Sequence, residues 1–278
     1  MKSLCTFLFV LFFFTVNAQT IYFNNNEYLP ALIELNSGEK MEGFVKDFKQ
    51  PRGFMVSPMG SFGKLEDNLT VKNNKISFKK EEKGSVEKVD VSTIKRIEFK
   101  GEMDNEVFEH LKIKSIKKGK IMDDYRDVFV PLIREGKLNL YGAFISVSQG
   151  GQSQVVMVMT YIKKPGDEFG YAPVDFENLT LFSGQEAAQE GFSRAIETVG
   201  RDCPAFVEKM KLEMEKMNSK EERKKMLADY ATTQKEIAEA SKKGKTKEDR
   251  EAIANEYQMN YMLKGYLEMM HTYDTTCP

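Results

Sequence analysis

The fold is decided by the stretch LNLYGAFISVSQGGQSQVVMVMTYIK, which covers residues 138–163. Two runs rich in β-branched and aromatic residues, 138–147 and 154–163, flank the turn residues Gln149-Gly150-Gly151. Such side chains favour strands, and a short glycine-containing link between two runs is typical of a β-hairpin. The stretch therefore predicts a long hairpin at the centre of a β-sheet.

Toward the N-terminus the same pattern recurs in shorter runs. Residues 31–35 and 40–46 flank Asn36-Ser37-Gly38-Glu39, which has the turn residues of a second hairpin. Further strand-forming runs lie at 76–78, 86–91, 93–99 and 107–113. Residues 127–134 are instead interpreted as a helical turn that ends at Glu135-Gly136. Short, evenly spaced strands are typical of a compact antiparallel sheet or a partly open barrel.

Beyond residue 182 the hydrophobic period changes to that of helices. Three Ser or Thr residues precede an acidic residue at capping-box spacing: Ser183 with Glu186, Ser219 with Glu222 and, as a weaker version, Thr246 with Asp249. The predicted helices cover residues 184–199, 204–217, 220–242 and 247–273. Helices joined by short links can pack as an antiparallel bundle. The sequence thus predicts an α+β fold, with an antiparallel β-sheet or partly open barrel followed by a C-terminal antiparallel helical bundle.

Apolar side chains recur along one face of the later helices. They are Phe206, Val207, Met210, Met214 and Met217 in the second predicted helix, and Ile253, Tyr257 and Tyr261 with the row Met262, Tyr266 and Met270 in the last. This spacing is that of amphipathic helices, which pack through their apolar faces.

The first eighteen residues have the features of a cleavable secretory signal peptide. Lys2 supplies a positive charge, residues 4–16 form a mostly apolar run, and Asn17-Ala18 precede an expected cleavage site at Gln19. The run is short for a spanning helix, which needs about 20 apolar residues. Cys5 precedes most of the apolar run, whereas the lipidated cysteine of a lipoprotein follows it. We therefore expect a signal peptide at 1–18, a β-rich domain at 19–182, a helical domain at 183–278 and no transmembrane segment in the mature chain.

The two cysteines that follow this signal, Cys203 and Cys277, are expected to form a disulfide in an oxidising compartment. Within one chain only this pairing exists, although a bridge between two chains is the alternative. A loop of this length gives an upper stabilisation of roughly 4 kcal/mol in the chain-entropy model.

No motif in the sequence predicts a catalytic, cofactor or metal site. The two histidines, His110 and His271, fall in different predicted domains without a metal-binding motif around them. Residues 60–64 lack the full spacing of a phosphate-binding loop. The chain has 41 Lys and Arg residues against 42 Asp and Glu residues, whereas nucleic-acid-binding proteins present a basic patch or stripe. Nucleic acid is therefore not an expected partner.

Aromatic residues crowd the first β-rich segment: Tyr22, Phe23, Tyr28, Phe44, Phe48 and Phe54. Most are expected in the core. An exposed subset would suit a glycan-binding or peptide-binding groove, because aromatic anchors are enriched at binding surfaces.

The layout resembles uncharacterised exported proteins of Bacteroidetes, in which a β-rich N-terminal part precedes a helical tail. The resemblance is carried by short motifs: Gly38-Glu39-Lys40-Met41-Glu42-Gly43, Glu135-Gly136-Lys137-Leu138-Asn139-Leu140-Tyr141, Asp202-Cys203-Pro204 with the closing Tyr273-x-x-x-Cys277, and the processing site Asn17-Ala18-Gln19. It implies export and this two-part layout, and no activity.

The favoured hypothesis is an exported soluble envelope protein that acts as a binding or structural module for an unknown protein or glycan of the cell envelope. Its expected location is periplasmic, outer-membrane-associated or secreted. The alternative is an envelope hydrolase with an unrecognised active site in the β-rich domain, built from scattered acidic residues or a lone nucleophile. The missing catalytic motif favours the first hypothesis over an enzyme.

Overall fold

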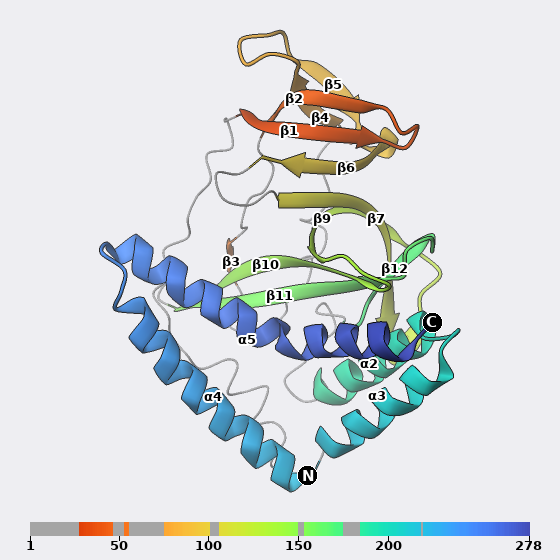
Figure 1. Cartoon of the computed structure of the whole chain (residues 1–278), viewed down its shortest axis with the longest axis vertical. Helices are drawn as coiled ribbons and strands as arrows, with labels where there is room; N and C mark the ends of the chain where they lie inside the picture. The colour runs from red at the N-terminus through yellow and green to blue at the C-terminus, as the bar shows by residue number, and fades with distance from the viewer. Residues whose placement is uncertain are drawn as a thin grey trace.

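Five strands close into a barrel at the centre of the molecule (Figure 1). The computed structural model describes residues 28–46, 53–55, 75–100, 106–149, 153–174, 184–217 and 219–278. In barrel order the strands are β7 (Glu106–Lys117), β9 (Arg126–Arg134), β10 (Asn139–Gln149), β11 (Ser153–Lys163) and β12 (Phe169–Ala172). Neighbours along this path pair antiparallel, and a parallel pairing of β12 with β7 closes the barrel.

The same sheet continues beyond β7 as an open extension, at the top of Figure 1. Its strands run in the order β6 (Ile94–Phe99), β1 (Tyr28–Leu35), β2 (Lys40–Lys46), β4 (Lys75–Lys79) and β5 (Glu87–Asp90), with the 3-10 helix η3 (Val91–Thr93) between β5 and β6. Two short strands pair at the margins: β3 (Gly53–Met55) with β10 and β8 (Lys120–Ile121) with β7. The extension has its own core, in which Ile33, Phe78, Ile97 and Phe99 are buried.

Both predicted hairpins are confirmed. Strands β1 and β2 pair from Tyr28 opposite Lys46 to Glu34 opposite Lys40. In the turn, Gly38 adopts a φ of 86°, a conformation that glycine reaches without steric cost. Strands β10 and β11 pair along their whole length, from Asn139 opposite Lys163 to Gln149 opposite Ser153.

The prediction of a helical turn at 127–134 is wrong, because this segment is strand β9. Three consecutive residues, Val128, Phe129 and Val130, are buried. Val128 and Val130 lie opposite Leu111 and Glu109 of β7, while Phe129 packs in the core of the extension. A strand buried on both faces lacks the polar–apolar alternation that identifies strands in a sequence.

The C-terminal part contains four helices among its described residues, and their predicted positions are confirmed. They are α2 (Gly184–Val199), α3 (Pro204–Met217), α4 (Lys220–Ser241) and α5 (Lys247–Thr276). The Ser219 hydroxyl group caps α4 by accepting a hydrogen bond from the backbone amide of Glu222. Thr246 and Asp249 form a complete, reciprocal capping box at the start of α5, although this pair has the weaker match in sequence. Ser183 lies outside the described residues.

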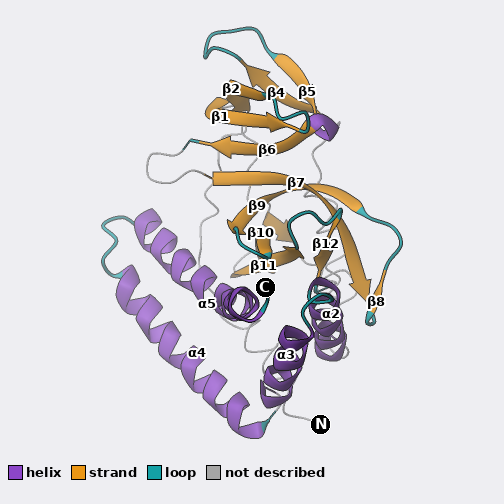
Figure 2. Ribbon diagram, turned by 45° about the vertical axis from the view of Figure 1, so that its right-hand side comes forward, coloured by secondary structure: helices purple, strands orange, loops and turns teal. Residues whose placement is uncertain are grey.

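The barrel and the helices share one hydrophobic core. Leu138, Leu140 and Ile162 of the barrel side are buried in the same cluster as apolar residues of α2, α3 and α5. In both views α5 lies along the barrel, while α4 meets α5 at the turn that joins them and diverges from it (Figures 1 and 2). The α+β fold is therefore confirmed, and the antiparallel packing of all four helices as a bundle stays a prediction. No helix in the described parts of the chain is long and apolar enough to cross a membrane.

Candidate functional site

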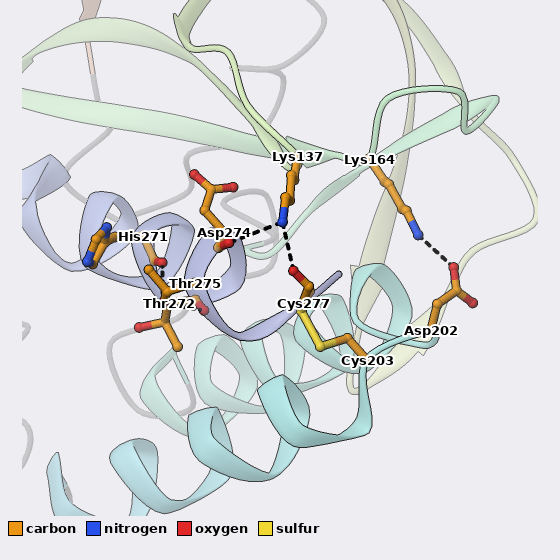
Figure 3. Close-up of a disulfide and its surroundings, with 9 residues drawn as sticks. All are labelled: Lys137, Lys164, Asp202, Cys203, His271, Thr272, Asp274, Thr275 and Cys277. Atoms are coloured by element: carbon orange, nitrogen blue, oxygen red, sulfur yellow. Dashed lines mark hydrogen bonds and ion pairs between the residues drawn. A yellow bond between two sulfur atoms is a disulfide. The ribbon is translucent and has the colours of Figure 1, made fainter.

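Cys203 and Cys277 lie at disulfide distance, as the sequence predicts (Figure 3). Their Cα atoms are 5.6 Å apart and the pair spans 74 residues of sequence. Cys203 immediately precedes α3, and Cys277 caps the end of α5. Both are buried, with 5% and 6% of their surface exposed. The disulfide therefore joins the start of one helix to the end of another inside the shared core.

The barrel supplies the positive charge that the end of α5 lacks. The last turn of α5 contains no basic residue, although cations stabilise the carbonyl-rich C-terminus of a helix. From the loop between β9 and β10, Lys137 Nζ donates hydrogen bonds to the carbonyl oxygens of Cys277 at 2.8 Å and Asp274 at 3.3 Å (Figure 3). Arg134 forms an ion pair with the Asp274 carboxylate. The loop thus fixes the final turn of α5 to the barrel.

A second barrel loop holds the other half of the disulfide. Lys164, the residue after β11, pairs at 2.6 Å with Oδ2 of Asp202, the residue before Cys203 (Figure 3). The hydrogen bond from Lys164 lowers the pKa of the Asp202 carboxyl group. Arg201 makes a bidentate pair with Asp167, at 2.7 Å and 3.0 Å. The disulfide junction, defined here as Cys203, Cys277 and these loop contacts, is thereby tied to the barrel on both sides.

One face of α5 packs into the shared core next to this junction. Leu263, Met270 and Tyr273 are buried on it. The Tyr273 and Phe206 rings meet edge to face with centroids 4.9 Å apart. Aromatic pairs of this geometry favour a defined packing, so the helix is held along its length as well as at its end.

The opposite, outward face of α5 forms a groove with α4. The groove has a volume of about 680 Å³, is open to solvent, and is lined by Thr233 and Glu236 of α4 and by eight residues of α5 between 257 and 272. Their spacing of three and four residues places them on one helix face. Tyr257 and Leu267 are large apolar side chains that stay 41% and 36% exposed within it. We call this surface the α5 groove.

The floor of the α5 groove is anchored by an aromatic pair between the two helices. Tyr261, which lines the groove, packs against the buried Tyr230 of α4 with ring centroids 5.7 Å apart. Burial raises the pKa of both tyrosine hydroxyl groups. Gln234 donates to Gln258 at 3.2 Å and adds a polar link between the helices. Tyr261 is therefore held in place, whereas Tyr257 stays 41% exposed.

The helical periodicity is misleading at this surface. It assigns Tyr257 to an apolar packing face, yet Tyr257 is exposed, as is Met217 at the end of α3. Tyrosine combines an apolar ring with a hydroxyl group, so it occurs in cores and at exposed binding surfaces alike. Its presence in an apolar stripe does not distinguish the two. The sequence feature that indicates the groove is a second row of aromatic and polar residues on α5, opposite the row that is buried.

The structure describes two of the aromatic side chains that are expected in the first β-rich segment, those of Tyr28 and Phe44. Tyr28 and Phe44 are half-buried in β1 and β2, with the Lys79 ammonium 4.2 Å from the centre of the Tyr28 ring. Tyr22, Phe23, Phe48 and the side chain of Phe54 lie outside the described residues.

A polar network joins the barrel to the open extension. The Tyr141 hydroxyl donates to Glu109 Oε2 at 2.6 Å and accepts from Asn139 Nδ2 at 2.9 Å. Arg96 Nε of β6 lies 3.7 Å from Glu109 Oε1. Burial raises the pKa of Tyr141 well above its ordinary value. Each of these groups has a partner of opposite charge or hydrogen-bonding character, which is typical of a buried structural network.

The carboxyl groups described below do not have the raised pKa that the general acid of a hydrolase needs. A general acid of a carboxylate pair has a raised pKa. Among the described carboxyl groups with a resolved shift the pKa is lowered, in each case chiefly by a hydrogen bond, at Glu34, Glu42, Asp90, Glu197, Asp202 and Asp249.

The two histidines lie in different surroundings. His110 is partly buried on β7, stacked on Phe129, with Nε2 3.2 Å from Asp127 Oδ1. Burial lowers its pKa and the Asp127 carboxylate opposes this effect. His271 is exposed and lines the α5 groove. No cluster of His, Cys, Asp or Glu suited to a metal ion occurs among the described residues, and residues 60–64 lie outside them.

Compared with protein-family models, curated proteins and solved structures, the chain matches none of them.

Proposed function

We propose that this chain is an exported protein of the cell envelope that acts as a binding module, and that the α5 groove takes its ligand. The observation that carries the proposal is the exposure of Tyr257 and Leu267 in a groove of about 680 Å³ on a helix whose other face is buried. Ligand sites are concave, and combine apolar and aromatic side chains with a few polar groups. The α5 groove has this combination.

Two features support export. The leading residues 1–18 have the order of a signal peptide, and Cys203 and Cys277 lie at disulfide distance. Disulfides persist in oxidising compartments such as the bacterial periplasm. The location is periplasmic, outer-membrane-associated or secreted, and the partner is a protein or glycan of the envelope.

The contacts that hold α5 against the barrel suit a binding function. A site on a rigid helix loses less conformational entropy on binding than a mobile loop does. Lys137, Arg134 and the disulfide fix the end of α5 beside the groove residues His271 and Thr272.

The export half of the proposal is tested by the intact mass of the natively exported protein, with and without reduction and alkylation. The expected result is a chain that begins at Gln19 and has both thiols blocked until it is reduced. A retained leader or two freely alkylated thiols would contradict it.

The binding half is tested by retention of a soluble envelope extract on the immobilised protein. Tyr257→Ser should lose the retained component. Tyr125→Ser is the matched control, because Tyr125 is 46% exposed on the barrel and lies outside the groove. Equal retention by both variants would contradict a role for the α5 groove.

A further inference from the structure

We infer that the barrel sets the geometry in which the disulfide closes, so that Cys203 and Cys277 become bonded once the helices have packed against the barrel. A thiol oxidant is the reactant that this step needs. The inference is independent of the ligand of the α5 groove. It is carried by the contacts that two barrel loops make on either side of the cysteine pair (Figure 3).

The helices by themselves leave a long path between the two thiols. The pair spans 74 residues, which include α3, α4 and α5, and α4 diverges from α5 in both views (Figures 1 and 2). Phe206 of α3 meets Tyr273 of α5. The core around this contact is completed from the barrel side by three fully buried residues, Leu138, Leu140 and Ile162. The place where the two helix ends meet is therefore built in part by the barrel.

Each cysteine is held by a different barrel loop. On the side of Cys277, Lys137 Nζ lies 2.8 Å from the carbonyl oxygen of that residue. On the side of Cys203, Lys164 Nζ lies 2.6 Å from Oδ2 of Asp202, the preceding residue. The two loops follow β9 and β11, which are fixed relative to each other because both strands pair with β10. The sheet therefore sets the separation of the two cysteine backbones.

This placement acts on the second chemical step of bond formation. In thiol–disulfide exchange one protein thiolate attacks an oxidant such as glutathione disulfide, forms a mixed disulfide and releases one glutathione thiolate. The second protein thiolate attacks the protein sulfur of the mixed disulfide and releases the second glutathione. Two protein thiols are thus oxidised to one disulfide, and one glutathione disulfide is reduced to two glutathione molecules. The second attack is intramolecular, so it depends on the effective concentration of one thiol at the other.

Burial separates the two steps. Cys203 and Cys277 are 5% and 6% exposed in the packed protein, so an external oxidant reaches a thiol before the end of α5 packs. The second attack needs the two sulfur atoms in contact, and the packed arrangement supplies this, with Cα atoms 5.6 Å apart. Packing against the barrel therefore raises the effective concentration, and burial then protects the finished bond from thiols in solution.

The inference is tested by equilibrating the full exported chain with mixtures of reduced and oxidised glutathione. Acid quenching, alkylation of free thiols and mass measurement give the bridged fraction, and from it the effective concentration of the pair. We expect this concentration to be about a thousandfold higher in native buffer than in concentrated urea. Lys137→Met should lower the native value by about tenfold and Lys164→Met by about threefold, because a segment that is no longer held moves away while the bond is open.

Two further variants are controls, and circular dichroism of the reduced variants checks that each is folded. Lys137→Arg retains a cation with N–H donors and should stay within about threefold of the parent. Lys209→Met, on the exposed side of α3, should change the value by less than about twofold. If Lys137→Met does not fold, Lys164→Met carries the test, because its exposed ion pair contributes less to stability.

Values equal to that of the parent in Lys137→Met and Lys164→Met would overturn the inference, because contacts that are equally strong in the open and the bridged protein do not direct closure. An equal loss in Lys209→Met would overturn it as well.

Discussion

Lys137 Nζ donates a hydrogen bond to the carbonyl oxygen of Cys277 across 2.8 Å, although the two residues are 140 positions apart in the chain. The contact joins a barrel loop to Cys277, which is both the C-cap of α5 and one half of the disulfide. It supplies a cation to a helix end that has none of its own. The end of the candidate binding helix is therefore determined by the barrel, not by the helix sequence alone.

Replacing Lys137 should destabilise the whole fold. Lys137→Met removes the cation and the part-buried hydrogen bond to the Cys277 carbonyl group, together with the exposed one to Asp274, and we expect the free energy of unfolding to fall by about 1–3 kcal/mol. Urea denaturation measures it. Lys209→Met, on the exposed side of α3, should change the free energy by less than about 0.5 kcal/mol; a similar loss in both variants would contradict the capping role.

Removing the disulfide should lower stability by up to about 4 kcal/mol, because the unfolded chain regains the entropy of a loop closed between Cys203 and Cys277. The double variant Cys203→Ser with Cys277→Ser, compared with the oxidised parent by urea denaturation, measures this loss. Reduction of the parent should shift its midpoint to that of the double variant. An unchanged midpoint on reduction would show that the pair is not bridged.

Two glycines of the β1–β2 region should respond differently to substitution. A Cβ on Gly43 would lie 2.3 Å from the Lys79 carbonyl oxygen and 2.7 Å from the Phe78 ring, so Gly43→Ala should cost about 1–3 kcal/mol by overpacking. Gly38 has open space around it and a φ of 86°, so Gly38→Ala should cost about 1 kcal/mol.

Asparagine separates the two causes, because it tolerates a positive φ better than alanine does. Gly38→Asn should recover part of the loss at the turn, whereas Gly43→Asn should be at least as damaging as Gly43→Ala. Thermal unfolding of the four variants checks the ranking. Recovery at position 43 would show that the β2–β4 contact is looser than described.

His110 should make the protein less stable in mild acid. Burial holds its pKa below the ordinary value of 6.5, against the opposing effect of Asp127, and Lys112 lowers it further. Below pH 6.5 the unfolded chain therefore binds more protons at this position than the folded one does, and the free energy of unfolding decreases as the pH falls.

His110→Gln should make the free energy of unfolding depend less steeply on pH between about pH 7 and about pH 5. Urea denaturation at several pH values measures this dependence. Asp127→Asn removes the opposing attraction and should make that slope steeper. Identical slopes in the parent and His110→Gln would exclude this residue as a source of the dependence.

The elements that the sequence predicts well are those with local signals. The turn at Asn36-Ser37-Gly38-Glu39 and the helix start at Pro204 each depend on a few adjacent residues. Closure of the barrel has no such signal, because it pairs Phe169 with Lys112 in a parallel ladder between distant strands. Strand β9 is missed for a related reason: Val128, Phe129 and Val130 are buried on both faces, so the alternation that would identify a strand is lost.

The candidate site was predictable only in part. Once Cys5 of the expected signal peptide is set aside, the two remaining cysteines allow a single intramolecular pair, so Cys203 and Cys277 follow from counting. The partners Lys137 and Arg134 do not, since their contacts with α5 depend on how the barrel packs against the helices. The groove residues Tyr257 and Tyr261 are visible as a periodic row, but periodicity alone does not state which row of a helix faces the core.

The most direct test of the central claim, ligand binding along α5, is hydrogen exchange of the full exported chain with and without the soluble envelope extract. The account predicts slower amide exchange in residues 257–272 and in the part of α4 around Thr233 and Glu236, with unchanged exchange in the strands near Tyr125. Protection confined to the strands, or no protection anywhere, would contradict it.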